Sequence, residues 1–175
     1  LEAGAGFSSF DLVLGRDLLQ GSAEPGALLA LLASQFAGAR FATIESLPRE
    51  GGRLSALPLE PSLGSELAAR FAAFEEGFYG REGPPELGPD AEALGALAAA
   101  SPLKEARSER IVETFRRRLG REEVATWFAP SSAYGSRAAA SFKAEELERI
   151  KAAVLGAAAA GLDWPLAGLI VQGKL

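Results

Sequence analysis

Residues 101–120 read SPLKEARSERIVETFRRRLG, and the structure of this stretch decides the fold predicted for the whole chain. The Ser-Pro pair at its start is typical of a helix N-terminus, with the serine as cap and the proline at the first helical position. Glycine, here Gly120, commonly follows the last residue of a helix. The stretch therefore predicts a long central helix that ends at Leu119.

The side chains of this predicted helix sort into three faces. At about 100° per residue, one face is apolar and a second is acidic, the latter with Glu105, Glu109 and Glu113. A third face, within an arc of about 100°, carries four arginines: Arg107, Arg110, Arg117 and Arg118. A guanidinium group makes two parallel hydrogen bonds to a carboxylate or phosphate, so this arginine face is the predicted partner-binding surface. Ordinary surface ion pairs along the helix are the alternative interpretation.

On the N-terminal side of this segment, the patterns predict strands and two helices. Residues 7–14 predict a strand, and residues 27–36 predict an apolar helix. Residues 39–59 predict a β-hairpin whose second strand begins at Arg53. Between Ser62, the predicted cap, and Phe78, apolar residues recur with helical spacing and indicate a helix that buries a row of phenylalanines.

The remaining segments predict short helices and a final strand. Residues 91–100 form an alanine-rich helix, and residues 121–128 add one or two helical turns. Residues 131–136 predict a loop, and Ser141 is the predicted cap of the last long helix. Residues 166–172 are apolar enough for a buried strand.

These elements predict a helix-rich α+β fold in a single domain, 1–175, with a small mixed or antiparallel sheet. The sheet would contain the N-terminal strand, the 39–59 hairpin and the C-terminal strand. Alanine and leucine dominate the apolar residues, whereas valine and isoleucine together number nine, which favours helix. Residues 80–90 hold three glycines and three prolines, and this loop is the only candidate internal boundary.

The composition narrows the chemistry that the chain can perform. It contains no histidine, cysteine, methionine or asparagine. These absences remove the commonest general base, the thiolate nucleophile, disulfides and most transition-metal ligand sets. Ser101 and Lys104 match an S-x-x-K motif, but the companion S-D-N and K-T-G elements of serine acyl-enzymes are missing. We therefore expect no catalytic residue, metal or cofactor.

The function favoured by these observations is a non-catalytic protein–protein interaction module, as a subunit or assembly factor of a larger complex. Its partner would present an acidic surface to the arginine face and to Tyr79 and Arg81, which we expect to be exposed at the start of the 80–90 loop. A net charge of −5 argues against nucleic acid as the partner.

Two other functions stay open at this stage. One is a hydrolase that uses only carboxylate, hydroxyl and arginine side chains. The other is a subunit of a membrane complex that uses the apolar segment 152–171, although Asp163 and Pro165 argue against a bilayer span. We expect a soluble protein, by convention cytoplasmic; a processed organellar protein is the alternative for a chain that begins at Leu1.

Overall fold

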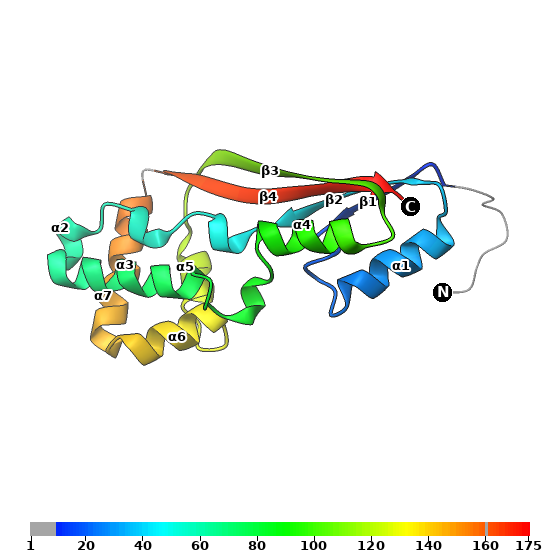
Figure 1. Cartoon of the computed structure of the whole chain (residues 1–175). Helices are drawn as coiled ribbons and strands as arrows, with labels where there is room; N and C mark the ends of the chain where they lie inside the picture. The colour runs from blue at the N-terminus through cyan, green and yellow to red at the C-terminus, as the bar shows by residue number, and fades with distance from the viewer. Residues whose placement is uncertain (1–9, 160) are drawn as a thin grey trace. The chain divides into compact units, whose positions relative to one another are not determined.

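The computed structural model describes residues 10–159 and 161–175, and it confirms a helix-rich α+β fold with one four-stranded mixed sheet (Figure 1). The strands are β1 (Leu12–Arg16), β2 (Arg40–Ser46), β3 (Lys104–Arg117) and β4 (Leu162–Lys174). Their order in the sheet is β1-β2-β4-β3, with β1 parallel and β4 antiparallel to β2. The predicted first strand began at residue 7, and residues 7–9 lie outside the described part of the chain.

The chain folds into two compact units. The sheet unit comprises the described residues up to Leu47, together with Gly88–Val112 and Ala167–Leu175. The helical unit comprises Pro48–Leu87 and Glu113–Leu166, so β3 and β4 each contribute residues to both units. One boundary between the units falls at Leu87–Gly88, inside the 80–90 loop. The assignment of the whole chain to one domain stays a prediction.

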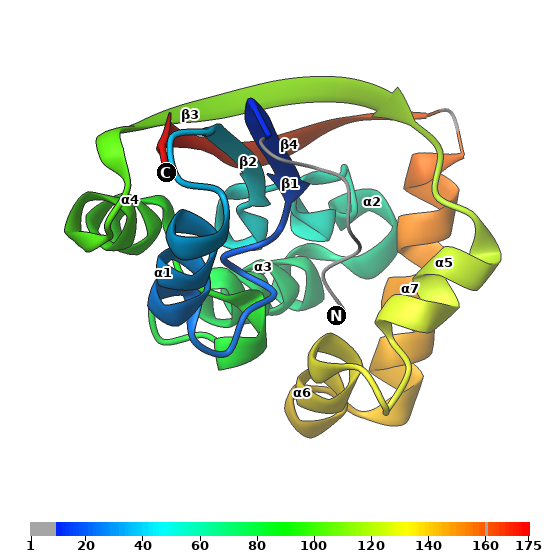
Figure 2. The ribbon, with the colours of Figure 1, turned by 90° about the vertical axis from the view of Figure 1, so that its right-hand side faces the viewer.

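In the sheet unit, helices α1 (Pro25–Gln35) and α4 (Ala91–Ala100) lie on the same side of the sheet (Figures 1 and 2). Alternate residues of β2 point toward these helices, and Phe41 packs with Leu29 of α1 and Leu94 of α4 in one buried cluster. The bounds of α4 are those predicted. Helix α1 begins two residues earlier than predicted, because Pro25 fits the first turn, where no backbone N–H is needed.

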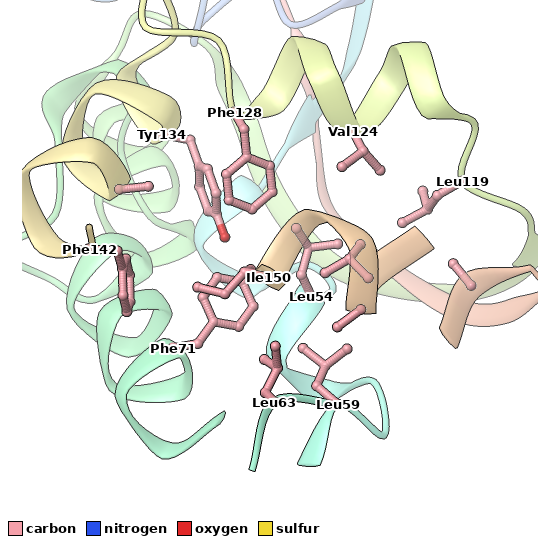
Figure 3. Packing of buried hydrophobic residues seen from close by; sticks show 14 of the residues in the cluster. Leu54, Leu59, Leu63, Phe71, Leu119, Val124, Phe128, Tyr134, Phe142 and Ile150 are labelled. Atoms are coloured by element: carbon pink, nitrogen blue, oxygen red, sulfur yellow. The ribbon is translucent and has the colours of Figure 1, made fainter. Parts of the chain in front are cut away.

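The helical unit contains α2 (Glu60–Leu63), α3 (Ser65–Tyr79), α5 (Arg121–Trp127), α6 (Ala133–Ser141) and α7 (Ala144–Ala158). Its core is rich in aromatic side chains (Figure 3). Phe71 of α3 is fully buried, and its ring centroid lies 6.5 Å from that of Phe128 and 6.2 Å from that of Phe142. The predicted row of phenylalanines therefore belongs to the core.

The predicted central helix is wrong, because residues 104–117 form the strand β3. Ser101 ends α4 instead of starting a helix, since its backbone N–H bonds to the carbonyl of Ala98 and its hydroxyl accepts from the N–H of Leu103. Ile111 and Val112 are β-branched and suit a strand. Pairing with β4 supplies the backbone hydrogen bonds and outweighs the modest helix preference of the arginines and glutamates.

The predicted second strand of the 39–59 hairpin is also wrong. Residues 53–59 contain a short 3-10 turn at Leu54–Ala56, and β2 pairs with β1 and β4. The N–H groups of Leu54 and Ser55 bond to the carboxylate of Glu75, so they are not available to a β-ladder. A buried acceptor elsewhere in the chain decides the conformation of this segment.

Three predicted helix boundaries differ from those of the structure. Gly64, with φ at 78°, separates α2 from α3, so Ser62 lies inside α2 and does not cap the long helix. The predicted loop 131–136 contains the start of α6, because Ser132 caps it by accepting from the N–H of Gly135. Ser141 is the last residue of α6 and not the cap of α7.

Candidate functional site

The face of the sheet opposite α1 and α4 carries exposed apolar side chains. In β1, Leu12 and Leu14 are 42% and 69% exposed, and Ile44 of β2 is 46% exposed. The register places Leu14 beside Ala42, and it places Ile44 beside Ile170 of β4. Because successive side chains of a strand point to opposite faces, these residues form one continuous apolar surface.

The edge strand β3 contributes to the same face within the sheet unit. The side chain of Ile111 comes within 3.4 Å of the position that a Cβ atom would take at Gly168 of β4. Ser108 points the other way, toward α4, because its Oγ lies 3.2 Å from the corresponding position at Gly95. By alternation, Arg107 and Glu109 lie on the side of Ile111.

We call this surface the open face. Its members are Leu12, Leu14 and Arg16 of β1, Arg40, Ala42 and Ile44 of β2, Arg107, Glu109 and Ile111 of β3, and Ile170, Gln172 and Lys174 of β4. Four of these residues are cations and only Glu109 is an acid. All four cations are exposed, and Arg16 pairs with its neighbour Asp17 at 3.4 Å. On a chain with a net charge of −5, the open face is locally basic.

The predicted arginine-lined helix face is wrong, because residues 104–117 form a strand. Arg107 and Arg110 point to opposite sides of β3 in the sheet unit, because a strand alternates where a helix would group them. Arg117 belongs to the helical unit, where it pairs with Glu123. Arg118 follows the strand in that unit and is exposed.

Arg117 also contacts an aromatic pair in the helical unit. Its guanidinium carbon lies 5.9 Å from the ring centroid of Trp127 and 5.6 Å from that of Trp164. The two indole centroids are 5.7 Å apart. Cation–π attraction and the ion pair with Glu123 together hold this side chain in place, which gives Arg117 a structural role.

The other two predicted contact residues, Tyr79 and Arg81, lie at the end of α3 and just after it. Arg81 is exposed, as expected. Tyr79 is half-buried, contrary to the expectation, because the guanidinium carbon of Arg53 lies 3.8 Å from its ring centroid. Burial, and to a lesser extent the charge of Glu75, raises the pKa of Tyr79 to about 12.

Glu75 of α3 is fully buried, which its charged side chain did not lead us to expect. Its carboxylate accepts hydrogen bonds from the N–H of Leu54 (3.2 Å), the N–H of Ser55 (2.6 Å) and the hydroxyl of Tyr134 (2.9 Å). Burial, the charge of Glu75 and this hydrogen bond all raise the pKa of Tyr134 far above its usual range. The one sequence signal is the place of Glu75 four residues after Phe71, on the apolar face of the helix.

A second buried carboxylate plays a similar part in the sheet unit. Glu45 of β2 accepts from the N–H groups of Leu19 and Gln20 and, at 2.6 Å, from the hydroxyl of Thr43. Its place two residues after Thr43 puts both side chains on the buried face of the strand. Hydrogen-bond donors that lie close in space bind the carboxylates of Glu45 and Glu75, so we assign both side chains a structural role.

The helical unit also contains a cavity of about 460 Å³, lined by Gly51–Arg53, Ala56–Pro58, Ala157 and Gly161–Pro165. The guanidinium of Arg53 donates to the carbonyl of Gly51 at 2.8 Å and stacks on Tyr79. Asp163, the carboxylate of this lining, pairs with Arg116 at 3.3 Å. The described lining therefore assembles no pair of carboxylates for acid and base catalysis.

Among residues 10–159 and 161–175, no three acidic side chains converge in a group that could hold a metal ion. No helix in the described part of the chain is long and apolar enough to cross a bilayer; residues 152–158 belong to α7, and residues 162–171 belong to β4.

Comparison with known proteins adds no relative. No protein-family model matches the chain, and no curated protein matches it either.

Proposed function

We propose that the protein is a non-catalytic protein–protein interaction module, a subunit or assembly factor of a larger complex, and that it binds its partner through the open face. The observation that carries this proposal is the exposure of Leu12, Leu14 and Ile44 at adjacent positions of one sheet. A continuous exposed apolar surface with a polar margin is typical of an interaction site.

The charges of the open face support a partner with an acidic surface. Arg40, Arg107 and Lys174 lie beside the apolar residues on a chain that is acidic as a whole. Complementary charges at the margin of an interface accelerate association and select among partners, while the apolar centre supplies most of the affinity. We therefore still expect a partner with an acidic surface, but it would bind the open face and not an arginine-lined helix.

The experiment compares two substitutions of exposed leucines. Tagged wild-type protein, Leu14→Glu and Leu31→Glu are each expressed in the cells of origin, and co-purifying proteins are quantified against the bait by mass spectrometry. Leu14 lies on the open face, and Leu31 is 56% exposed on α1, on the other side of the sheet. We expect a stoichiometric partner that Leu14→Glu loses and that Leu31→Glu keeps.

Thermal unfolding controls for folding, since both substitutions replace exposed side chains and are expected to change stability by no more than about 0.5 kcal/mol. A partner that stays bound to Leu14→Glu, or a bait that purifies without any stoichiometric protein, contradicts the proposal.

A further inference from the structure

We infer that the segment of the partner that covers the open face is an amphipathic α-helix of about four turns with acidic residues along one side. This inference rests on the proposed function and specifies its partner. Three properties of the open face support it: the direction of its apolar band, the position of its cations and the sign of their charge.

The apolar residues form a diagonal band across the sheet. It runs from Leu12 and Leu14 on β1, through Ile44 on β2 and Ile170 on β4, to Ile111 on β3. With strands about 4.8 Å apart and same-face residues about 6.7 Å apart along a strand, the band is about 25 Å long. A straight helix of about 16 residues has this length.

The direction of the band also suits a helix. From the same spacings, its axis makes an angle of roughly 35° with the strands. A partner strand would pair with an edge strand, β1 or β3, through backbone hydrogen bonds and would leave the face with Leu14 and Ile44 uncovered. A helix with a stripe of apolar side chains can lie along the band and cover both of these residues.

Most of the cations lie on one side of this band. Arg40 is beside Leu12, and Lys174 is beside Arg40. Arg107 lies farther along the same side on β3 together with Glu109, so three cations there outnumber one acid. The other side carries Arg16, which already pairs with Asp17. A bound helix would therefore be expected to place glutamates or aspartates along the side that faces Arg40, Lys174 and Arg107.

The same charges disfavour two other occupants. A second copy of this chain docked through the same face would bring together two surfaces with the same net positive charge, and like charges repel at an interface. An anionic membrane would attract the cations but repel Glu109, and the residues of the open face include no tryptophan or phenylalanine of the kind typical of membrane-surface anchors.

Two synthetic peptides of opposite charge test the inference. The acidic probe is a stapled helical peptide of about 16 residues with one leucine stripe and glutamates beside it. The control probe has lysine at every glutamate position. Binding to the full chain is measured by fluorescence anisotropy. We expect the acidic peptide to bind about tenfold more tightly at low salt, and this preference to shrink at high salt.

Substitutions in the chain locate the binding. Leu14→Glu is expected to abolish binding of the acidic peptide, and Arg40→Glu is expected to weaken it by about fivefold. Arg137→Glu, which reverses an exposed charge on α6 in the helical unit, is expected to change nothing.

Three results would overturn the inference: equal or tighter binding of the lysine peptide, a dimer that Leu14→Glu converts to a monomer, or binding to anionic vesicles that Leu14→Glu removes while the acidic peptide does not bind. Each is distinct from failure of the proposed function, because the co-purification experiment reports separately whether a protein partner needs Leu14.

Discussion

Replacing Glu75 by alanine tests how much the buried carboxylate contributes to the helical unit. The substitution leaves three donors without their acceptor: the N–H groups of Leu54 and Ser55 and the hydroxyl of Tyr134. Leu54 and Tyr134 are buried, whereas Ser55 is partly exposed and can turn to water. Two buried donors at about 1–3 kcal/mol each give an expected loss of about 4 kcal/mol.

Three companion variants separate this effect from ordinary side-chain truncation. Tyr134→Phe removes one donor and leaves the other two bonded to the carboxylate, so we expect a loss of about 1.5 kcal/mol. Glu75→Gln keeps the size but loses part of the acceptor capacity, and should lie between Tyr134→Phe and Glu75→Ala. Glu76→Ala, the exposed neighbour, should stay within about 0.5 kcal/mol of the wild type.

Urea unfolding followed by tryptophan fluorescence measures these losses. Trp127 and Trp164 are the two tryptophans of the chain, and both belong to the helical unit, so the signal reports on that unit. A loss under about 1 kcal/mol for Glu75→Ala would refute the assigned role of the carboxylate. The same conclusion would follow if Glu75→Ala and Glu76→Ala were equally destabilised.

Two other predictions concern the helical unit. The pKa of both tyrosines is raised, that of Tyr79 to about 12 and that of Tyr134 further. A group with a raised folded pKa stabilises the fold below its unfolded pKa, so stability should fall as the pH rises above about 10. Just above this pH the folded protein should show little phenolate absorbance, and the absorbance should appear when the protein unfolds. Titration of both tyrosines near pH 10 in the folded protein would contradict this prediction. Gly52→Ala would place a Cβ atom 2.6 Å from the ring of Trp164 and should cost about 1–3 kcal/mol. Gly156→Ala, in α7 with open space around it, should raise the free energy of unfolding by about 0.5–1 kcal/mol in the same urea assay. If Gly52→Ala and Gly156→Ala changed this free energy equally, the close contact between position 52 and Trp164 would be refuted.

Patterns within a single segment of the sequence were sufficient to predict several of the helices. The apolar run 27–36 predicted α1, and the alanine-rich segment 91–100 predicted α4. The spacing of Leu67, Phe71 and Phe78 predicted a buried helix face, which the structure confirms. In each of these cases, one helix satisfies its own backbone hydrogen bonds, so the pattern within it carries the necessary information.

Pairing with a distant strand decided the conformation of residues 104–117, and it thereby decided which residues form the candidate site. A strand needs a neighbour for its hydrogen bonds, and the neighbour of β3 is β4, which follows three helices later in the chain. The choice between helix and strand therefore depended on contacts that residues 104–117 do not themselves encode. That choice separated Arg107 from Arg110, and the sheet register brought Leu14 and Ile44 onto one exposed face.

What the amino-acid sequence determined by itself is the helix-rich character of the chain, its apolar helix faces and the range of chemistry that its side chains allow. What only the tertiary structure decided is which side chains share a surface and which carboxylates become buried acceptors. Glu45 and Glu75 show the physical reason: each bonds to N–H groups at least twenty residues earlier in the chain, and only folding brings such donors within reach.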